Sequence, residues 1–164
     1  MSPDALAVAF AELLCENRAT LARLARHYAD PEDRQDLLQE FHLQLWRCFA
    51  NYEGRAKRST WLYRVALNVA LTRRRAAGRR PAHDPLDESH EPAADGEGAA
   101  MQRMEWTAVL RALRHMAPID RAILILALEG ASQQDTAEIL GITTGNAGVK
   151  LHRARRRLME LLEA

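Results

Sequence analysis

Residues 132–162 read SQQDTAEILGITTGNAGVKLHRARRRLMELL, and this stretch decides the fold of the C-terminal part of the chain. Ser132 is suited to cap a short helix over residues 133–140, and the turn Gly141-Ile142-Thr143 follows it. Thr144 then opens a longer helix that runs to about Leu162. A short helix, a turn of three residues with a glycine and a longer basic helix are typical of a helix-turn-helix, which predicts DNA binding. A plain helical hairpin is the alternative.

The longer helix is predicted to have two different faces. Its apolar stripe consists of Ala147, Leu151, Ala154, Leu158 and Leu161. The other face carries donors for phosphates and base edges at helical spacing, namely Asn146, Lys150, Arg153 and Arg157, and Thr144 joins them at the helix start. Gly145 and Gly148 are unusual here, because each costs roughly 1 kcal/mol of helix propensity relative to Ala. They either permit close approach to a DNA backbone or mark a marginal first turn.

A second basic segment lies between residues 55 and 80 and contains no acid. Its nine cations are Arg55, Lys57, Arg58, Arg64, Arg73, Arg74, Arg75, Arg79 and Arg80, with the rings of Tyr52, Trp61 and Tyr63 among or just before them. Cations beside aromatic rings are what binding of opened DNA or RNA requires. The alternative is a solvated basic helix end, since Arg near a helix C-terminus complements the helix dipole.

The same segment is predicted to be a helix from about Ser59 to Gly78. One face presents Trp61, Arg64, Asn68, Thr72 and Arg75, and the opposite, apolar stripe is formed by Leu62, Val65, Ala66 and Val69. A buried face and a basic, aromatic face on one element indicate a nucleic-acid-binding surface.

Two further helices precede this one. The first is expected from about Asp4 to Tyr28, with Ala7, Phe10, Leu14, Leu21 and Leu24 toward the core. Asp30-Pro31-Glu32-Asp33 then has the pattern of a helix start. The helix that follows is expected to bury Leu37, Leu38, Phe41, Leu45 and Phe49 and to expose Asp36, Gln39, Glu40 and Gln44.

Composition favours an all-α protein of two small helical domains. Residues 1–80 hold 14 Lys and Arg against 9 Asp and Glu, residues 81–104 hold 1 against 6, and residues 105–164 hold 8 against 7. The predicted organisation is therefore a basic domain over 1–80, an acidic flexible linker over 81–104 and a helix-turn-helix domain over 105–164. For the linker, a solvated tether and a specific role are both open.

The sequence does not indicate a metal site, a cofactor site or a catalytic site. Cys15 and Cys48 lie in helical apolar patterns and are expected to be buried thiols, and the scattered histidines do not have metal-ligand spacing. We expect no metal, no cofactor, no membrane insertion and a cytoplasmic location. No phosphate loop or nucleophile–base pattern stands out, so an enzyme is not expected.

Both halves of the chain resemble one family. Asp33-Arg-Gln-Asp36-Leu-Leu-Gln-Glu40-Phe-His-Leu-Gln-Leu-Trp46, followed by Ser59-Thr-Trp61-Leu-Tyr-Arg64-Val-Ala-Leu-Asn68, resembles region 2 of bacterial RNA polymerase sigma factors of the extracytoplasmic-function (ECF) type. Ser132-Gln-Gln-Asp-Thr-Ala-Glu-Ile-Leu-Gly141 and Leu151-His-Arg-Ala-Arg155 resemble region 4 of the same family. The order and spacing of the two agree, and they cover nearly the whole chain.

The resemblance implies a role for each surface. Asp36, Gln39 and Glu40 match the positions that dock on the clamp of the polymerase β′ subunit. Tyr52, Trp61, Arg64, Asn68, Thr72 and Arg75 match the surface that opens the −10 element and captures a flipped base, although Trp61 is equally suited to anchor the core. Thr144, Asn146, Lys150, Arg153 and Arg157 match the helix that contacts the −35 element.

The implied function is an ECF-type sigma factor that binds core RNA polymerase, through the β′ clamp and the β flap, and melts promoter DNA. An anti-sigma factor is a possible further partner. The linker of this family threads through the polymerase, where its acids could mimic nucleic acid. Gly148 and Val149 depart from the basic and small polar residues of many relatives, so fewer fixed donors are expected toward the −35 element. The alternative function is a stand-alone helix-turn-helix regulator.

Overall fold

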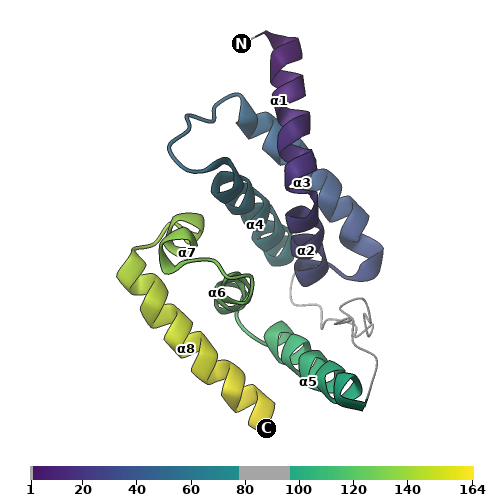
Figure 1. Cartoon of the computed structure of the whole chain (residues 1–164), viewed down its shortest axis with the longest axis vertical. Coiled ribbons are helices and arrows are strands. Elements are labelled where there is room, and N and C mark those ends of the chain that lie inside the picture. Colours follow the sequence, from purple (N-terminus) through teal and green to yellow (C-terminus); the bar gives the residue numbers. More distant parts are fainter. Residues whose placement is uncertain (1, 78–96) are drawn as a thin grey trace. The chain divides into compact units, whose positions relative to one another are not determined.

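The computed structural model describes residues 2–77 and 97–164, with backbone alone for 97–104, and within these ranges every regular element is a helix. The chain divides into two units, Met1–Pro85 and Leu86–Ala164 (Figure 1). The all-α class predicted from the sequence is therefore confirmed. In the part of the chain that is described, no helix is long and apolar enough to cross a membrane.

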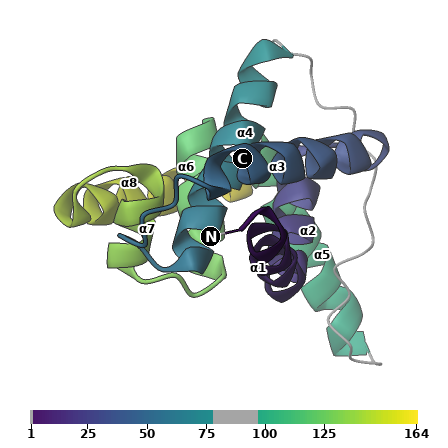
Figure 2. The same ribbon diagram turned by 90° about the horizontal axis from the view of Figure 1, so that it is seen from above.

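The N-terminal unit is a small bundle. It consists of α1 (Pro3–Glu16), α2 (Arg18–Tyr28), the short 3-10 helix η1 (Pro31–Asp33), α3 (Arg34–Phe49) and α4 (Arg58–Ala76). Helices α2, α3 and α4 pack on one another in all three pairs, and Figure 2 looks nearly down the axis of α1 beside them. The centre of this core is fully buried and is built from Leu24, Leu37, Phe41, Leu45 and Leu62.

The prediction of one helix from Asp4 to Tyr28 is wrong, because the chain breaks at Asn17. The backbone of Asn17 leaves the helical region, with φ −109° and ψ 12°, and its side-chain Nδ2 donates to the Leu13 carbonyl over 2.8 Å. An Asn side chain competes in this way with the backbone for helical carbonyls. The break ends α1 at Glu16, and α2 begins at Arg18.

Helix α1 packs less than the sequence suggested. Leu13 is its one buried residue, whereas Ala7 is exposed and Phe10 and Leu14 are only half-buried. Cys15 is exposed and Cys48 is half-buried, so the expectation that both thiols are buried is also wrong. A helix whose apolar residues surround it cannot bury them all against one neighbour.

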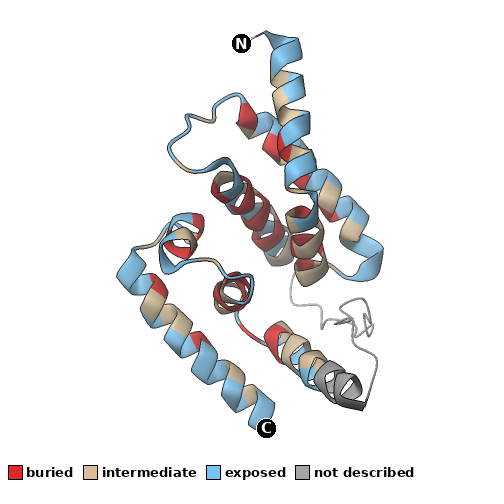
Figure 3. Cartoon of the chain, viewed as in Figure 1, coloured by how far each residue is buried: buried red, intermediate tan, exposed pale blue. Residues whose placement is uncertain are grey.

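Helix α4 is the core helix of this unit. Seven of its 19 residues are buried, and Figure 3 shows their run along it: Thr60, Leu62, Tyr63, Ala66, Leu67, Ala70 and Leu71. Val65 and Val69 of the predicted apolar stripe are only half-buried, as is Leu38 on α3. Compared with the predicted apolar stripe, the buried side of α4 is shifted toward Tyr63 and Leu67, because α4 packs against both α2 and α3.

The C-terminal unit consists of α5 (Glu97–Arg114), α6 (Pro118–Leu128), α7 (Gln133–Leu140) and α8 (Thr144–Glu163). Helix α8 packs against the other three helices. Its core joins Leu113, Met116, Leu124 and Ala154, with the half-buried Val109, Leu110, Leu151, Leu158 and Leu161 against it. Helix α5 begins at Glu97, so its first turns lie within residues 81–104, which the sequence assigned to the linker.

A buried arginine fixes the turn from α5 to α6. Arg121 is 2% exposed, and its guanidinium donates from Nε to the Leu113 carbonyl over 2.7 Å and from Nη2 to the Arg114 carbonyl over 2.6 Å. These are carbonyls of the last turn of α5, which have no partner inside their own helix. A cation at a helix C-terminus also meets the negative end of the helix dipole. No sequence pattern indicated this role, since Arg121 is separated from the basic segments.

Candidate nucleic-acid interface

The exposed edge of α4 contains the residues expected to meet DNA. Arg64, Asn68, Thr72 and Arg75 are all exposed, and Trp61 is half-buried at the start of the same edge. The opposite side of α4 is buried in the core. The exposed edge is therefore a narrow line of side chains on a helix that the core holds in place. The structure thus brings the five residues together, while their contact with DNA stays a prediction.

An aromatic cluster supports the beginning of that edge. The Trp61 ring centroid lies 5.1 Å from that of Tyr52 and 6.1 Å from that of Phe49. The Tyr52 hydroxyl donates to the Ala56 carbonyl and so closes the loop that joins α3 to α4. Phe49 extends the cluster to Phe10, at 5.4 Å. Tyr52 and Trp61 are therefore held in place by other rings and by the loop, and each still has exposed area.

Tyr63 does not belong to this surface. The sequence grouped it with the rings that could stack on bases, but its side chain is buried in the core of the N-terminal unit, with 7% exposed. Tyr63 lies two residues beyond Trp61, and on a helix this places it well away from the Trp61 edge. Only Tyr52 and Trp61 remain as candidate stacking rings.

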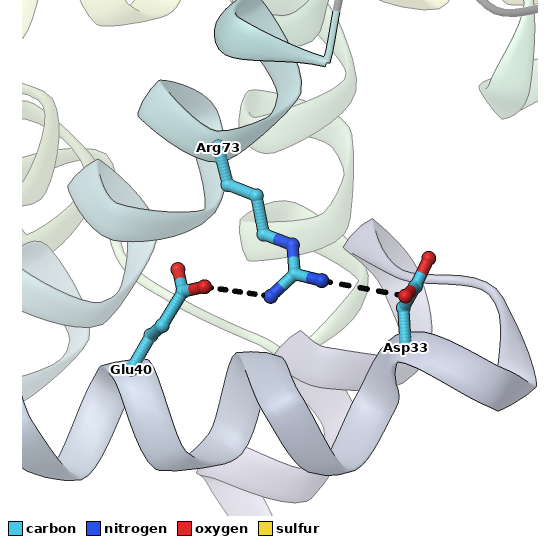
Figure 4. A network of polar contacts seen from close by, with 3 residues as sticks. All are labelled: Asp33, Glu40 and Arg73. Carbon is cyan, nitrogen blue, oxygen red and sulfur yellow. Dashed lines mark hydrogen bonds and ion pairs between the residues drawn. The ribbon is translucent and has the colours of Figure 1, made fainter.

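Arg73, one of the nine cations, is bound to acidic residues of two other elements of the unit. Arg73 Nη1 lies 2.7 Å from Glu40 Oε1, and Arg73 Nη2 lies 3.4 Å from Asp33 Oδ1, as Figure 4 shows. The bridge joins α4 to α3 and η1. Arg73 is therefore not a freely available cation for phosphates, and Glu40 is not a freely available acid for a protein partner. Asp36 and Gln39 are exposed on the same helix.

The bridge could not be found from local spacing. Asp33 and Glu40 are seven residues apart, which places them on one side of η1 and α3, but Arg73 comes 33 residues after Glu40. The remaining members of the basic segment differ in their setting: Arg55 pairs with Glu53 at 2.6 Å, Lys57, Arg58 and Arg75 are exposed, and Arg74 is half-buried. Arg79 and Arg80 lie outside the described residues.

The helix-turn-helix has the boundaries that the sequence predicted. Ser132 Oγ accepts the Asp135 backbone N–H at 3.0 Å, Gly141 ends α7 with φ 66°, and Thr143 Oγ1 accepts the Asn146 backbone N–H at 3.2 Å. The positive φ favours glycine, because a Cβ would be strained there. Capping at both helix starts satisfies backbone donors that would otherwise lack a partner.

The predicted −35 residues lie along the outer side of α8. Thr144, Asn146, Arg153 and Arg157 are exposed, and Lys150 is half-buried. Arg157 Nη1 also pairs with Glu160 Oε2 at 3.0 Å, so part of its charge is neutralised near the end of the helix. The strongest candidates for DNA contact are therefore in the first three turns, where α8 carries no acid.

Packing within the C-terminal unit explains why position 148 is a glycine. A Cβ built at Gly148 would come within 2.4 Å of Gln133 Nε2, and this amide donates to the Thr144 carbonyl over 2.8 Å. Gly148 thus leaves room for a side chain of α7, which is a packing reason for glycine at this position. Gln133 was missed by the sequence analysis, and its helix-start position was the only signal. Gly145 has open space around it.

Two helical units, one with a basic aromatic edge and one with a helix-turn-helix, are features of a DNA-binding protein. No group of three or more His, Cys, Asp or Glu that could hold a metal lies among the described residues. Family models agree with this class: sigma-70 region 2 matches residues 13–80, and sigma-70 region 4 matches residues 106–158.

Curated relatives narrow the class further. The ECF RNA polymerase sigma factor SigM of Mycobacterium tuberculosis is 34% identical over 157 residues, which cover 94% of this chain and 77% of the relative. The ECF RNA polymerase sigma-E factor of Haemophilus influenzae is 31% identical, with 90% and 84% covered. The chain belongs to the ECF family of RNA polymerase sigma factors. As a sigma factor it works with core RNA polymerase and promoter DNA in transcription initiation.

Solved structures show the same fold. The sigma factor RpoE, in a co-crystal structure with the anti-sigma factor NepR from Bartonella quintana, aligns with a TM-score of 0.69 at 22% identity, over 95% of this chain and 98% of that one. CnrH in complex with the cytosolic domain of CnrY aligns with a TM-score of 0.66 at 24% identity, over 94% and 88%. Both similarities concern the fold alone.

Proposed function

We propose that the two units divide promoter recognition between them, with residues 1–80 on core polymerase and the −10 element, residues 81–104 as the linker, and residues 105–164 on the −35 element. The observation that carries the proposal is the pair of exposed edges, on α4 and on α8, each supported by a buried face and each within its matching family region.

The −10 side of the proposal rests on the α4 edge. Opening a duplex and flipping a base costs a few kcal/mol, which stacking and base-edge hydrogen bonds must offset. Tyr52 and Trp61 supply rings held by their neighbours, and Asn68 supplies a donor and an acceptor on a rigid helix. A surface that is ordered before binding loses less entropy when it captures a base. Arg64, Thr72 and Arg75 would contact the backbone beside it.

The polymerase side rests on α3. Asp36 and Gln39 are exposed and would meet the β′ clamp directly. Glu40 is held by Arg73 through Oε1, so a clamp residue would reach its other oxygen, and the bridge would orient the carboxylate for that contact. We further propose that the C-terminal unit binds the β flap, and that the protein acts in the cytoplasm, where transcription takes place.

An anti-sigma factor is a proposed additional partner. Support comes from the RpoE–NepR complex, whose sigma chain has this fold. Such a partner would compete with polymerase or DNA for the same surfaces on α3, α4 and α8. The stand-alone regulator is disfavoured, because it leaves the match of the N-terminal unit to sigma-70 region 2 without a purpose. No catalytic role is proposed for any residue.

The test is co-purification with core RNA polymerase, followed by run-off transcription on fragments of the host genome. A stoichiometric complex that starts RNA at discrete sites supports the proposal, and alignment of those sites supplies the promoter. Asp36→Ala should weaken the complex, whereas Glu12→Ala, at an exposed acid on α1, serves as the matched control. Protection of duplex DNA by the chain without any polymerase complex would overturn the proposal in favour of the stand-alone regulator.

A further inference from the structure

An apolar side chain interrupts the polar outer side of α8. Val149 is 50% exposed, although α8 has a separate buried side formed around Ala147 and Ala154. Val149 follows Asn146 by three residues and precedes Arg153 by four, so the three side chains lie next to one another on the helix surface. The core does not need Val149, and a β-branched residue is not favoured on an exposed helix.

The surroundings of Val149 point to nucleic acid and not to a protein surface. Between Thr144 and Arg157, α8 carries Lys150, Arg153, Arg155, Arg156 and Arg157 and no acid. Asn146 and Arg153 on either side are exposed donors. An apolar patch enclosed by cations and donors is suited to a ligand that combines negative charge with a small apolar group. The major groove of duplex DNA offers this combination, because phosphates line it and thymine projects a C5-methyl group into it.

We propose that Val149 is a specificity-determining residue that contacts the C5-methyl group of a thymine in the −35 element, with Asn146 and Arg153 contacting the adjacent base edges or phosphates. The inference rests on the proposed −35 role of α8 and adds the base that one of its residues selects.

Local packing supports a fixed position for this valine. Gln133 from α7 donates to the Thr144 carbonyl in the first turn of α8, and Thr143 caps the same turn through the Asn146 N–H. The first turn of α8 is therefore held in place both by a side chain of α7 and by its own N-cap residue. A single methyl contact can discriminate between bases only if the helix that carries it is held in this way.

The test replaces thymine by uracil, which removes only the C5-methyl group. Holoenzyme reconstituted from the full chain and core polymerase is titrated with promoter duplexes carrying uracil singly at each thymine of the −35 element. One position should weaken binding of the wild type by about fourfold, the value expected for burying one methyl-sized group. Val149→Ala holoenzyme should bind the thymine duplex about that much more weakly and be insensitive to uracil at that position.

Two control variants separate the possible failures. Met159→Ala removes another exposed apolar side chain of α8, 55% exposed, and should leave the uracil profile unchanged. Arg153→Ala should weaken binding of every duplex and reduce its salt dependence. If Arg153→Ala has no effect, the −35 role of α8 fails. If Arg153→Ala weakens binding but the uracil profiles of wild type and Val149→Ala coincide, the methyl contact is overturned while the DNA surface remains.

Discussion

Helices α4 and α8 are similar in length and in predicted role, but they differ in how they are supported. Seven of the 19 residues of α4 are buried, against two of the 20 residues of α8, Ala147 and Ala154 (Figure 3). Helix α4 is a core helix with one exposed edge, whereas α8 packs against the other three helices of its unit along one side and exposes most of its residues. Substitutions on α4 can therefore disturb fold and binding together, and substitutions on α8 report mainly on contacts.

The largest expected effect tests whether α4 is the core helix. Leu62 is fully buried, and Leu62→Ala should lower the free energy of unfolding by about 2–5 kcal/mol, since it removes packed atoms and leaves a cavity. Met159→Ala, at an exposed position of α8, should change it by less than about 0.5 kcal/mol. Urea unfolding followed by circular dichroism measures both. Similar small changes in the two variants would remove the contrast between the helices.

The next effect separates binding from fold on the free edge of α4. Asn68 is exposed, so Asn68→Ala should leave the free energy of unfolding within about 0.5 kcal/mol of the wild type. Opening of the −10 element should be weakened by about 1–3 kcal/mol, the value of a good base-edge contact. Fluorescence of a 2-aminopurine placed in the −10 element follows opening, and polymerase affinity is measured in parallel. An equal loss of opening and of polymerase affinity would show that Asn68 acts structurally.

A smaller effect is expected from the bridge between α4 and α3. Arg73→Ala removes the ion pairs to Glu40 and Asp33, whose carboxylates are about half exposed, at 47% and 57%. The expected loss in the free energy of unfolding is below about 1 kcal/mol and should shrink as salt is raised, because exposed ion pairs are screened. Arg64→Ala, on the exposed edge of the same helix, is the matched control. Equal losses for both variants at low salt would show that the bridge contributes nothing measurable.

The smallest effect concerns the start of α8. Gly148→Ala should gain about 1 kcal/mol of helix propensity. It should also displace the Gln133 side chain and lose one exposed hydrogen bond to Thr144, worth about 0.5–1.5 kcal/mol. The net change in unfolding free energy should be close to zero. In a Gln133→Ala background the same substitution should stabilise by about 1 kcal/mol, and an identical change in both backgrounds would dismiss the proposed coupling.

Much of the architecture could be predicted because it depends on local signals. The caps at Ser132 and Thr143 and the break at Gly141 act within a few residues, so the helix-turn-helix boundaries agreed with the structure. The single helix expected before Tyr28 failed for a local reason as well: a side chain–backbone hydrogen bond at Asn17 outweighed an uninterrupted apolar pattern. Periodicity alone does not detect such a break.

The candidate sites were predicted as lists of residues, and the structure changed the setting of several. Tyr63 was grouped with exposed rings and is buried, and Arg73 was counted as a DNA cation and is bound to two carboxylates. Gly148 was interpreted either as permitting close approach to DNA or as marking a marginal first turn, and the structure adds that it leaves room for Gln133. In each case the deciding partner is distant in sequence or lies on another helix.

By itself, the sequence determined which segments are helical, how the two helical halves are separated and which side chains carry cations, rings and donors. These properties follow from periodicity, capping and composition, which act over one or two helical turns. Only the tertiary structure decided which of those side chains are available. Four features show this: Tyr63 is buried, Arg73 bridges to two carboxylates, Gln133 packs over Gly148, and Arg121 is buried. Each of them arises when two helices pack, and local spacing does not encode which helices pack together.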